Sequence, residues 1–169
     1  NKINYPFSKE QLIPQEERLE LTQIKKEFIV GVPKEVSSNE KRICLTPDSV
    51  SYLISNDFKV NIETGAGEGS NFTDLDYSEA GAVIVNDKKD IYNCPIILKI
   101  TPPNELEVNL IKQNSILISG LDLTGNHLNN LRVLISKKIT CIAFEFIQES
   151  DGSYPIVSQQ NEISGQASV

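Results

Sequence analysis

The sequence predicts an α/β fold in which a parallel sheet is covered by helices on both faces. Short apolar segments alternate with helical patterns from residue 28 onward, and no internal repeat interrupts them. Several of these segments are continuously apolar, which is typical of strands buried on both faces. Strands that alternate with helices form right-handed βαβ units, and these build a parallel sheet. The length of 169 residues fits about one domain.

The first strand and helix have clear boundaries. Residues 28–32 form a short apolar run that ends at Pro33, as expected for a buried strand. Thr46 followed by Pro47 predicts a helix start, with the threonine as N-cap and the proline at the first helical position. An apolar face follows in this helix. Its members are Val50, Leu53 and Ile54.

The same alternation continues to residue 147. A short acidic helix is expected over residues 74–80, where Gly81 stops it, and a second helix over residues 104–111. The longest helix is expected over residues 124–138, and Lys137 and Lys138 suit its C-terminal dipole. Its apolar face is predicted to hold Leu128, Leu131 and Ile135. The strands predicted after the first are residues 59–63, 82–85, 95–100, 115–121 and 139–147.

Composition excludes several classes of partner. The formal net charge is −7, and no stretch holds more than two adjacent Lys or Arg residues. Nucleic acid and anionic membranes are therefore poor partners, because both require clustered cations. No apolar run reaches 18 residues, so we expect no membrane insertion by this segment. Three cysteines in apolar contexts predict buried reduced thiols, and hence a cytoplasmic protein without a metal site.

A glycine cluster at residues 65–70 raises the question of a dinucleotide-binding loop. The expected pattern is G-x-G-x-x-G opening directly into a helix. Here Ser70 takes the place of the third glycine, and Glu68 would put a negative charge near the phosphates. We therefore interpret the cluster as a tight structural loop.

Four polar residues are candidates for a site, each with a simpler alternative. Arg42 follows a strand and could hold a carboxylate, or form a surface salt bridge. Lys99 ends an apolar strand and could serve a site, or extend to solvent. Asp122 could be a catalytic carboxylate, or a turn residue. His127 has no useful partner at any nearby spacing, so a solvated helix position is expected.

Several motifs together resemble one family. They include Gly31-Val32-Pro33-Lys34-Glu35, Asn39-Glu40-Lys41-Arg42 and Leu45-Thr46-Pro47. Further along stand Glu63 to Ser70, Phe72 to Tyr77, Ile97-Leu98-Lys99-Ile100, Ile142-Ala143-Phe144-Glu145 and Asp151 to Pro155. In this order they resemble the N-terminal domain of alanine dehydrogenases and of the nicotinamide nucleotide transhydrogenase alpha subunit.

The resemblance implies a domain organisation. It implies an incomplete Rossmann/flavodoxin-like substrate domain at residues 28–161, after an N-terminal arm at residues 1–27. Residues 162–169 would begin the helix that leads to a missing NAD-binding domain. The cofactor would be NAD, bound mainly by that absent domain, so we expect the fragment alone to be inactive.

The resemblance also implies site residues. Arg42 matches the family's carboxylate-binding arginine, and Lys99 matches a lysine of the L-K-V-K-E-P pattern. The catalytic lysine of that pattern is replaced by Thr101, and the histidine of the L-H-L-A pattern by Asp122. Thr101 cannot supply a positive charge to an oxyanion, whereas Asp122 could act as an acid or base.

Three functions follow as hypotheses. The first is an NAD-dependent alanine dehydrogenase, which interconverts L-alanine and pyruvate. The second is transhydrogenase-like hydride transfer between nucleotides, and the third is a non-catalytic module that has lost the catalytic Lys and His. The expected partner is a small amino or keto acid, or a nucleotide, and we expect a homo-oligomer.

Overall fold

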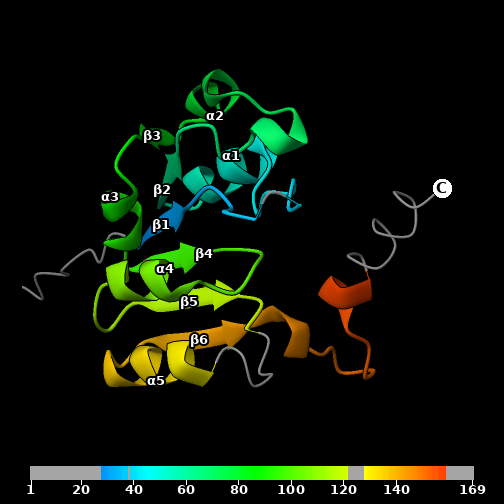
Figure 1. Ribbon diagram of the computed structural model, residues 1–169. Coiled ribbons are helices and arrows are strands. Elements are labelled where there is room, and N and C mark those ends of the chain that lie inside the picture. The colour runs from blue at the N-terminus through cyan, green and yellow to red at the C-terminus, as the bar shows by residue number, and fades with distance from the viewer. Residues whose placement is uncertain (1–27, 38, 122–127, 159–169) are drawn as a thin grey trace, which may run out of the picture.

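A computed structural model describes residues 28–37, 39–121 and 128–158, and their strands form one six-stranded sheet (Figure 1). The strand order is β3-β2-β1-β4-β5-β6, and every neighbouring pair is parallel. This confirms the predicted α/β class. The strands are β1 Phe28–Val32, β2 Phe58–Glu63, β3 Val83–Val85, β4 Ile96–Leu98, β5 Ile116–Ser119 and β6 Thr140–Ala143.

Helices cover both faces of the sheet. They are α1 Pro47–Ser55, α2 Asp74–Glu79, α3 Lys88–Tyr92, α4 Glu105–Leu110 and α5 Leu128–Ser136. One core includes Val50 of α1 and Tyr77 of α2, and a second includes Val108 of α4 and Leu134 of α5. Ile97 of β4 belongs to the second core, whereas its neighbours Ile96 and Leu98 pack on the first. Alternate residues of a strand face opposite sides, so the two cores lie on opposite faces.

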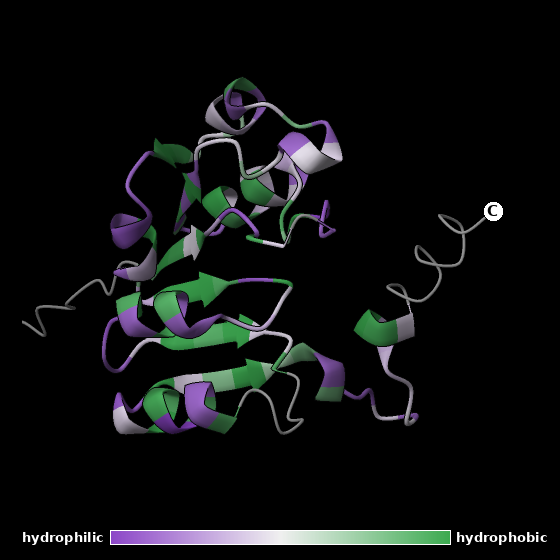
Figure 2. Ribbon diagram, viewed as in Figure 1, coloured by the Kyte–Doolittle hydropathy of each residue, from purple (hydrophilic) through white to green (hydrophobic). Residues whose placement is uncertain are grey.

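Local sequence signals explain how several helices begin. The Thr46 side chain accepts a 3.3 Å hydrogen bond from the Ser49 N–H, which confirms the predicted N-cap of α1. Thr73 and Asn104 form capping boxes at α2 and α4, where the third helical residue bonds back to the cap. Gly81 follows α2 with a φ of +95°, a conformation that suits the predicted glycine stop. Figure 2 shows apolar strands flanked by helices of mixed hydropathy.

The structure corrects four details of the predicted elements. Helix α3 was not predicted, because its five residues hold only two adjacent apolar side chains, Ile91 and Tyr92, and show no helical periodicity. Strand β6 ends at Ala143 rather than residue 147, and a 3-10 turn at Phe144–Phe146 follows it. Ile135 of α5 is 74% exposed, and the core side of this helix is formed by Leu131 and Leu134.

The fourth detail concerns Lys137, which caps a neighbouring helix instead of its own. Its Nζ donates hydrogen bonds to the carbonyl oxygens of Val108, Asn109 and Ile111 at the C-terminal end of α4. These are among the carbonyls that a helix leaves without internal partners. The predicted arm at residues 1–27, the helix at residues 162–169, and Asp122 and His127 lie outside the described residues.

Candidate functional site

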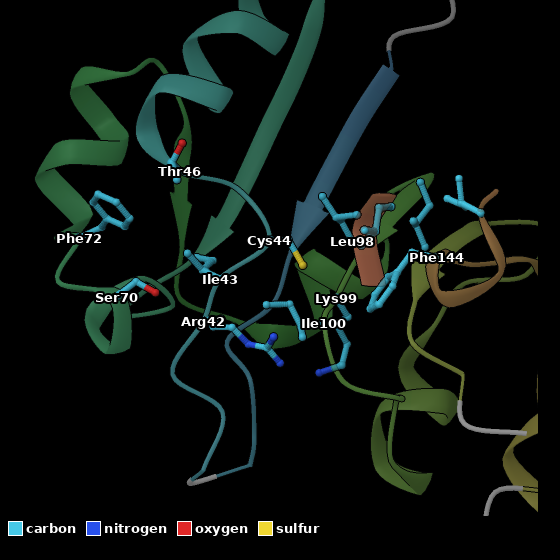
Figure 3. Close-up of a pocket in the computed structure, with 13 residues that line it drawn as sticks. Arg42, Ile43, Cys44, Thr46, Ser70, Phe72, Leu98, Lys99, Ile100 and Phe144 are labelled. Carbon is cyan, nitrogen blue, oxygen red and sulfur yellow. The ribbon is translucent and has the colours of Figure 1, made fainter. Parts of the chain in front are cut away.

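A cavity of about 420 Å³ lies beyond the carboxyl ends of β4 and β5 (Figure 3). Strands β1 and β4 are neighbours in the sheet, and the chain leaves them toward opposite sides, which makes this place the topological switch point. Much of the wall is apolar, with Ile43, Leu98, Ile118, Phe144 and Ile147 among its side chains. Arg42 and Cys44 enter from the loop that joins β1 to α1. The cavity is therefore an apolar space with a cation at its edge.

Arg42 is held by an acidic residue of its own loop. Its Nε donates to Oε1 of Glu40 over 2.8 Å, and its Nη2 donates to Oε2 over 2.7 Å. The pair lowers the pKa of Glu40 and raises that of Arg42, in both cases chiefly through these side-chain hydrogen bonds. The salt bridge and the place in the cavity wall thus occur together, although we stated them as alternatives. Figure 3 shows the Arg42 side chain directed toward Ile100 and Lys99.

Lys99 is buried, and its side chain does not extend to solvent. Its side chain is 0% exposed, and Nζ lies 2.7 Å from Oε2 of Glu35 and 3.4 Å from Oε1 of Glu107. The solvent-facing alternative for this lysine is therefore wrong. A buried ammonium is expected to be paired in this way, because leaving it unpaired would cost several kcal/mol, on the order of the penalty for desolvating an ion.

The Glu35 carboxylate accepts several hydrogen bonds from the turn that follows β4. Besides Lys99, it accepts hydrogen bonds from the Ile100 N–H at 2.7 Å, the Thr101 N–H and the Thr101 hydroxyl. Thr101, which replaces the lysine expected from the resemblance, is thus bonded to Glu35. Glu35 lies within the motif Gly31 to Glu35, but the motif alone did not predict a role for it.

Glu107 closes the network on its buried side. It accepts a 2.8 Å hydrogen bond from the Tyr92 hydroxyl, and Nζ of Lys88 lies 3.7 Å from its Oε1. Two carboxylates therefore face two ammonium groups, so the network is balanced in charge. Burial and the neighbouring Glu107 raise the pKa of Tyr92. Glu107 and Tyr92 were not predicted as site residues, and the capping-box position of Glu107 was the one local signal in the sequence.

Cys44 contributes a protonated thiol to the cavity. Burial first, and the charge of Glu35 second, raise its pKa from 9.0 to about 12. Cys94 is buried, Cys141 is half-buried, and all three cysteines are free. The prediction of reduced thiols is consistent with these positions, and a protonated thiol is a weak nucleophile.

The glycine cluster forms a packed turn beside the Arg42 loop. A Cβ at Gly69 would lie 2.6 Å from the backbone oxygen of Lys41, and one at Gly67 would lie 2.5 Å from the Tyr77 ring. Glu68 pairs with Lys34, with 3.0 Å between their charged atoms. These contacts support the interpretation as a structural loop.

Within the described ranges, no group of three or more His, Cys, Asp or Glu side chains is placed to hold a metal ion. No helix in those ranges is long and apolar enough to cross a membrane. Asp122 lies outside those ranges.

An open parallel sheet with a cavity at its switch point, lined by apolar side chains and one arginine, is the arrangement in which open α/β domains place their ligand sites. Residues 31–164 match the family model described as "Alanine dehydrogenase/PNT, N-terminal domain". The chain belongs to this family.

Individual relatives agree with this assignment. The chain is 37% identical over 141 residues to an alanine dehydrogenase of Staphylococcus saprophyticus, covering 83% of this chain and 38% of the relative. It is 36% identical over 139 residues to alanine dehydrogenase 2 of Staphylococcus aureus, covering 82% and 37% of the two chains. The chain thus spans under two fifths of the length of these relatives.

Solved structures support the same fold. An L-alanine dehydrogenase aligns with a TM-score of 0.71 and 33% identity, over 76% of this chain and 36% of that one. A transhydrogenase from Sinorhizobium meliloti aligns with a TM-score of 0.65 and 32% identity, over 69% of this chain and 35% of that one.

Proposed function

We propose that this chain is the N-terminal part of the substrate domain of an NAD-dependent, alanine dehydrogenase-like oxidoreductase. The whole protein would convert L-alanine, NAD and water to pyruvate, ammonia and NADH. The observation that carries the proposal is Arg42 at the rim of an apolar switch-point cavity, in a chain similar to alanine dehydrogenases. Residues 28–161 would form the domain piece, 1–27 an arm and 162–169 the start of a linking helix.

The cavity suits a short carboxylic acid with an apolar side chain. The guanidinium of Arg42 would bind the carboxylate, since arginine holds carboxylates by paired hydrogen bonds. The methyl group of alanine or pyruvate would face the apolar wall. Lys99 lines the same cavity through the end of β4, and its ammonium is paired with Glu35 and Glu107.

We assign the acid–base role to Asp122, because it stands where the L-H-L-A pattern of the family has its histidine. The Thr101 hydroxyl donates a hydrogen bond to Glu35, so its oxygen is left to accept a hydrogen bond from a substrate. Neither residue supplies the positive charge expected of the replaced lysine. Arg42 is thus the cation on which we base substrate binding.

We assign NAD binding to a part of the protein outside residues 1–169. The one glycine-rich loop after a described strand does not fit a dinucleotide phosphate, because Gly69 abuts the backbone of Lys41 and Glu68 occupies the turn. We therefore propose that a separate domain holds NAD and that residues 1–169 alone do not turn over substrate. We also propose a cytoplasmic homo-oligomer.

The test is turnover by the full-length gene product. Mixed with NADH, pyruvate and ammonium, it should consume NADH, and Arg42→Ala should raise the KM for pyruvate by at least about tenfold, as loss of a bidentate charge-assisted pair predicts. Lys41→Ala, which removes the adjacent cation, is the matched control and should keep its KM. An unchanged KM in Arg42→Ala would contradict the assignment.

A transhydrogenase-like reaction is the second candidate. It is favoured by the structural similarity to a transhydrogenase. It is also favoured by Thr101, which stands where the family's catalytic lysine is expected and is hydrogen-bonded to Glu35. It predicts hydride transfer between two nucleotides and no effect of pyruvate. If the full-length protein binds no nucleotide at all, the third hypothesis, a non-catalytic module, is favoured.

A further inference from the structure

We propose that Glu40 is a positioning and specificity residue of the substrate site. It holds one edge of the Arg42 guanidinium, leaves the other edge to the substrate carboxylate, and makes the site selective for monocarboxylates. The inference rests on the proposed role of Arg42 as carboxylate anchor.

The geometry of the ion pair leaves a second binding edge. A guanidinium has five N–H donors, and Glu40 takes the one on Nε and one on Nη2. Among the described residues, Nη1 has no hydrogen-bond partner. One hydrogen of Nη1 and the second hydrogen of Nη2 form another pair of parallel donors that matches the two oxygens of a carboxylate. Pairing with Glu40 therefore does not block Arg42.

The loop around the pair is held in place. Oε1 of Glu40 also accepts from the Arg42 backbone N–H at 2.9 Å, and the Glu40 side chain is only 12% exposed. On the other side, the Ser70 hydroxyl donates to the Lys41 carbonyl oxygen at 2.8 Å. The guanidinium is thus oriented before a substrate arrives, and less side-chain entropy is lost on binding.

The charges around Arg42 favour a ligand with a single carboxylate. Glu40 balances the charge of Arg42, and Glu35 lines the same small cavity as both of them. The charge of Lys99 is already matched by Glu35 and Glu107. A second carboxylate on the substrate would meet the apolar wall, Glu35 and Glu40, and the Lys99 ammonium beside them is already paired.

Glu40→Gln tests this in the full-length gene product. Glutamine keeps the volume and one acceptor but loses the charge and the second acceptor, so the KM for pyruvate should rise about tenfold while kcat stays within threefold. The ratio of kcat/KM for pyruvate to that for 2-oxoglutarate should fall at least fivefold. Glu68→Gln is the matched control, because Glu68 is an exposed partner of Lys34 in the adjacent loop.

A purely structural role is separated by two further readouts. Positioning through Arg42 predicts that Glu40→Gln has less than a twofold effect on KM in an Arg42→Ala background, and that Tm stays within 2 °C of the parent. An unchanged KM and selectivity in Glu40→Gln, or an equal effect in both backgrounds, would overturn the inference alone. Failure of the parent to consume NADH, or full pyruvate affinity in Arg42→Ala, would remove the proposed function, and the inference with it.

Discussion

Glu35 and Lys99 form a buried ion pair of 2.7 Å between the loop after β1 and the end of β4. Their strands are neighbours at the switch point of the sheet, although the residues are 64 positions apart in sequence. The same carboxylate also holds the Ile100 amide and Thr101. The floor of the candidate site is therefore fixed by a polar contact rather than by apolar packing alone.

Removing the charge of Lys99 should destabilise the protein strongly. Lys99→Met leaves the buried Glu35 carboxylate without its cation and removes one of the partners of Glu107. Breaking a buried ion pair in this way typically lowers the free energy of unfolding by about 3–5 kcal/mol. Urea unfolding of the full-length gene product measures this change. Adding Glu35→Gln to Lys99→Met should recover part of the loss, and a single variant as stable as the parent would disprove the role of the pair.

Stability should fall at alkaline pH in a way that depends on Cys44. The pKa of this thiol is raised from 9.0 to about 12 in the folded protein, so the folded state holds its proton where the unfolded state has lost it. This contribution is complete below pH 9 and is lost as the pH rises toward 12, with a slope of at most about 1.4 kcal/mol per pH unit. Thermal unfolding between pH 8 and 11 should show a shallower slope in Cys44→Ala.

Lys137 should stabilise α4 through the end of that helix. Lys137→Met removes the donor for three carbonyl oxygens, and charged hydrogen bonds of this kind are worth about 1.5–3 kcal/mol together with the cost of unpaired carbonyls. Chemical denaturation should show a loss of this size. Lys138→Met changes the next residue and should have less than half the effect; equal effects would argue against the cap.

Gly69 should affect substrate binding although it lies outside the cavity wall. A methyl group at this position would meet the Lys41 backbone at 2.6 Å and push the loop that carries Arg42. A small displacement of a group that positions the substrate slows the reaction, so Gly69→Ala should lower kcat/KM for pyruvate by about tenfold. Ser70→Ala, which removes one hydrogen bond to the same carbonyl, should have a smaller effect. Steady-state kinetics with unaltered constants in Gly69→Ala would refute this.

Much of the fold follows from local patterns. Apolar runs, and an alternating pattern at residues 59–63, predicted all six strands, and Thr46 with Pro47 predicted the start of α1. Helix α3 was not predicted, because a five-residue helix in which the buried Ile91 and Tyr92 are adjacent has no helical periodicity. Strand β6 was predicted too long, because its apolar run continues into a turn where Glu145 bonds the Leu121 amide.

The site was predicted less completely than the fold. Arg42 and Lys99 were found from their places at strand ends, and both line the cavity. The partners of Lys99 were not predicted, because Glu35 and Glu107 become its neighbours only when the sheet is assembled. Glu40 lay within a quoted motif, but sequence alone does not show which edge of a guanidinium a carboxylate occupies.

The junction between β1 and β4 is short, and this has a consequence for local opening. Only the pairs Val30–Ile96 and Gly31–Ile97 are in register there. The buried side chains of β1 and β2 belong to the first core, whereas the second contains Ile97 of β4 and Leu117 of β5. Two such halves can open as separate cooperative units. The Ile100 amide, bonded to Glu35 rather than to a strand, would then report this opening by its rate of hydrogen exchange, independently of global unfolding.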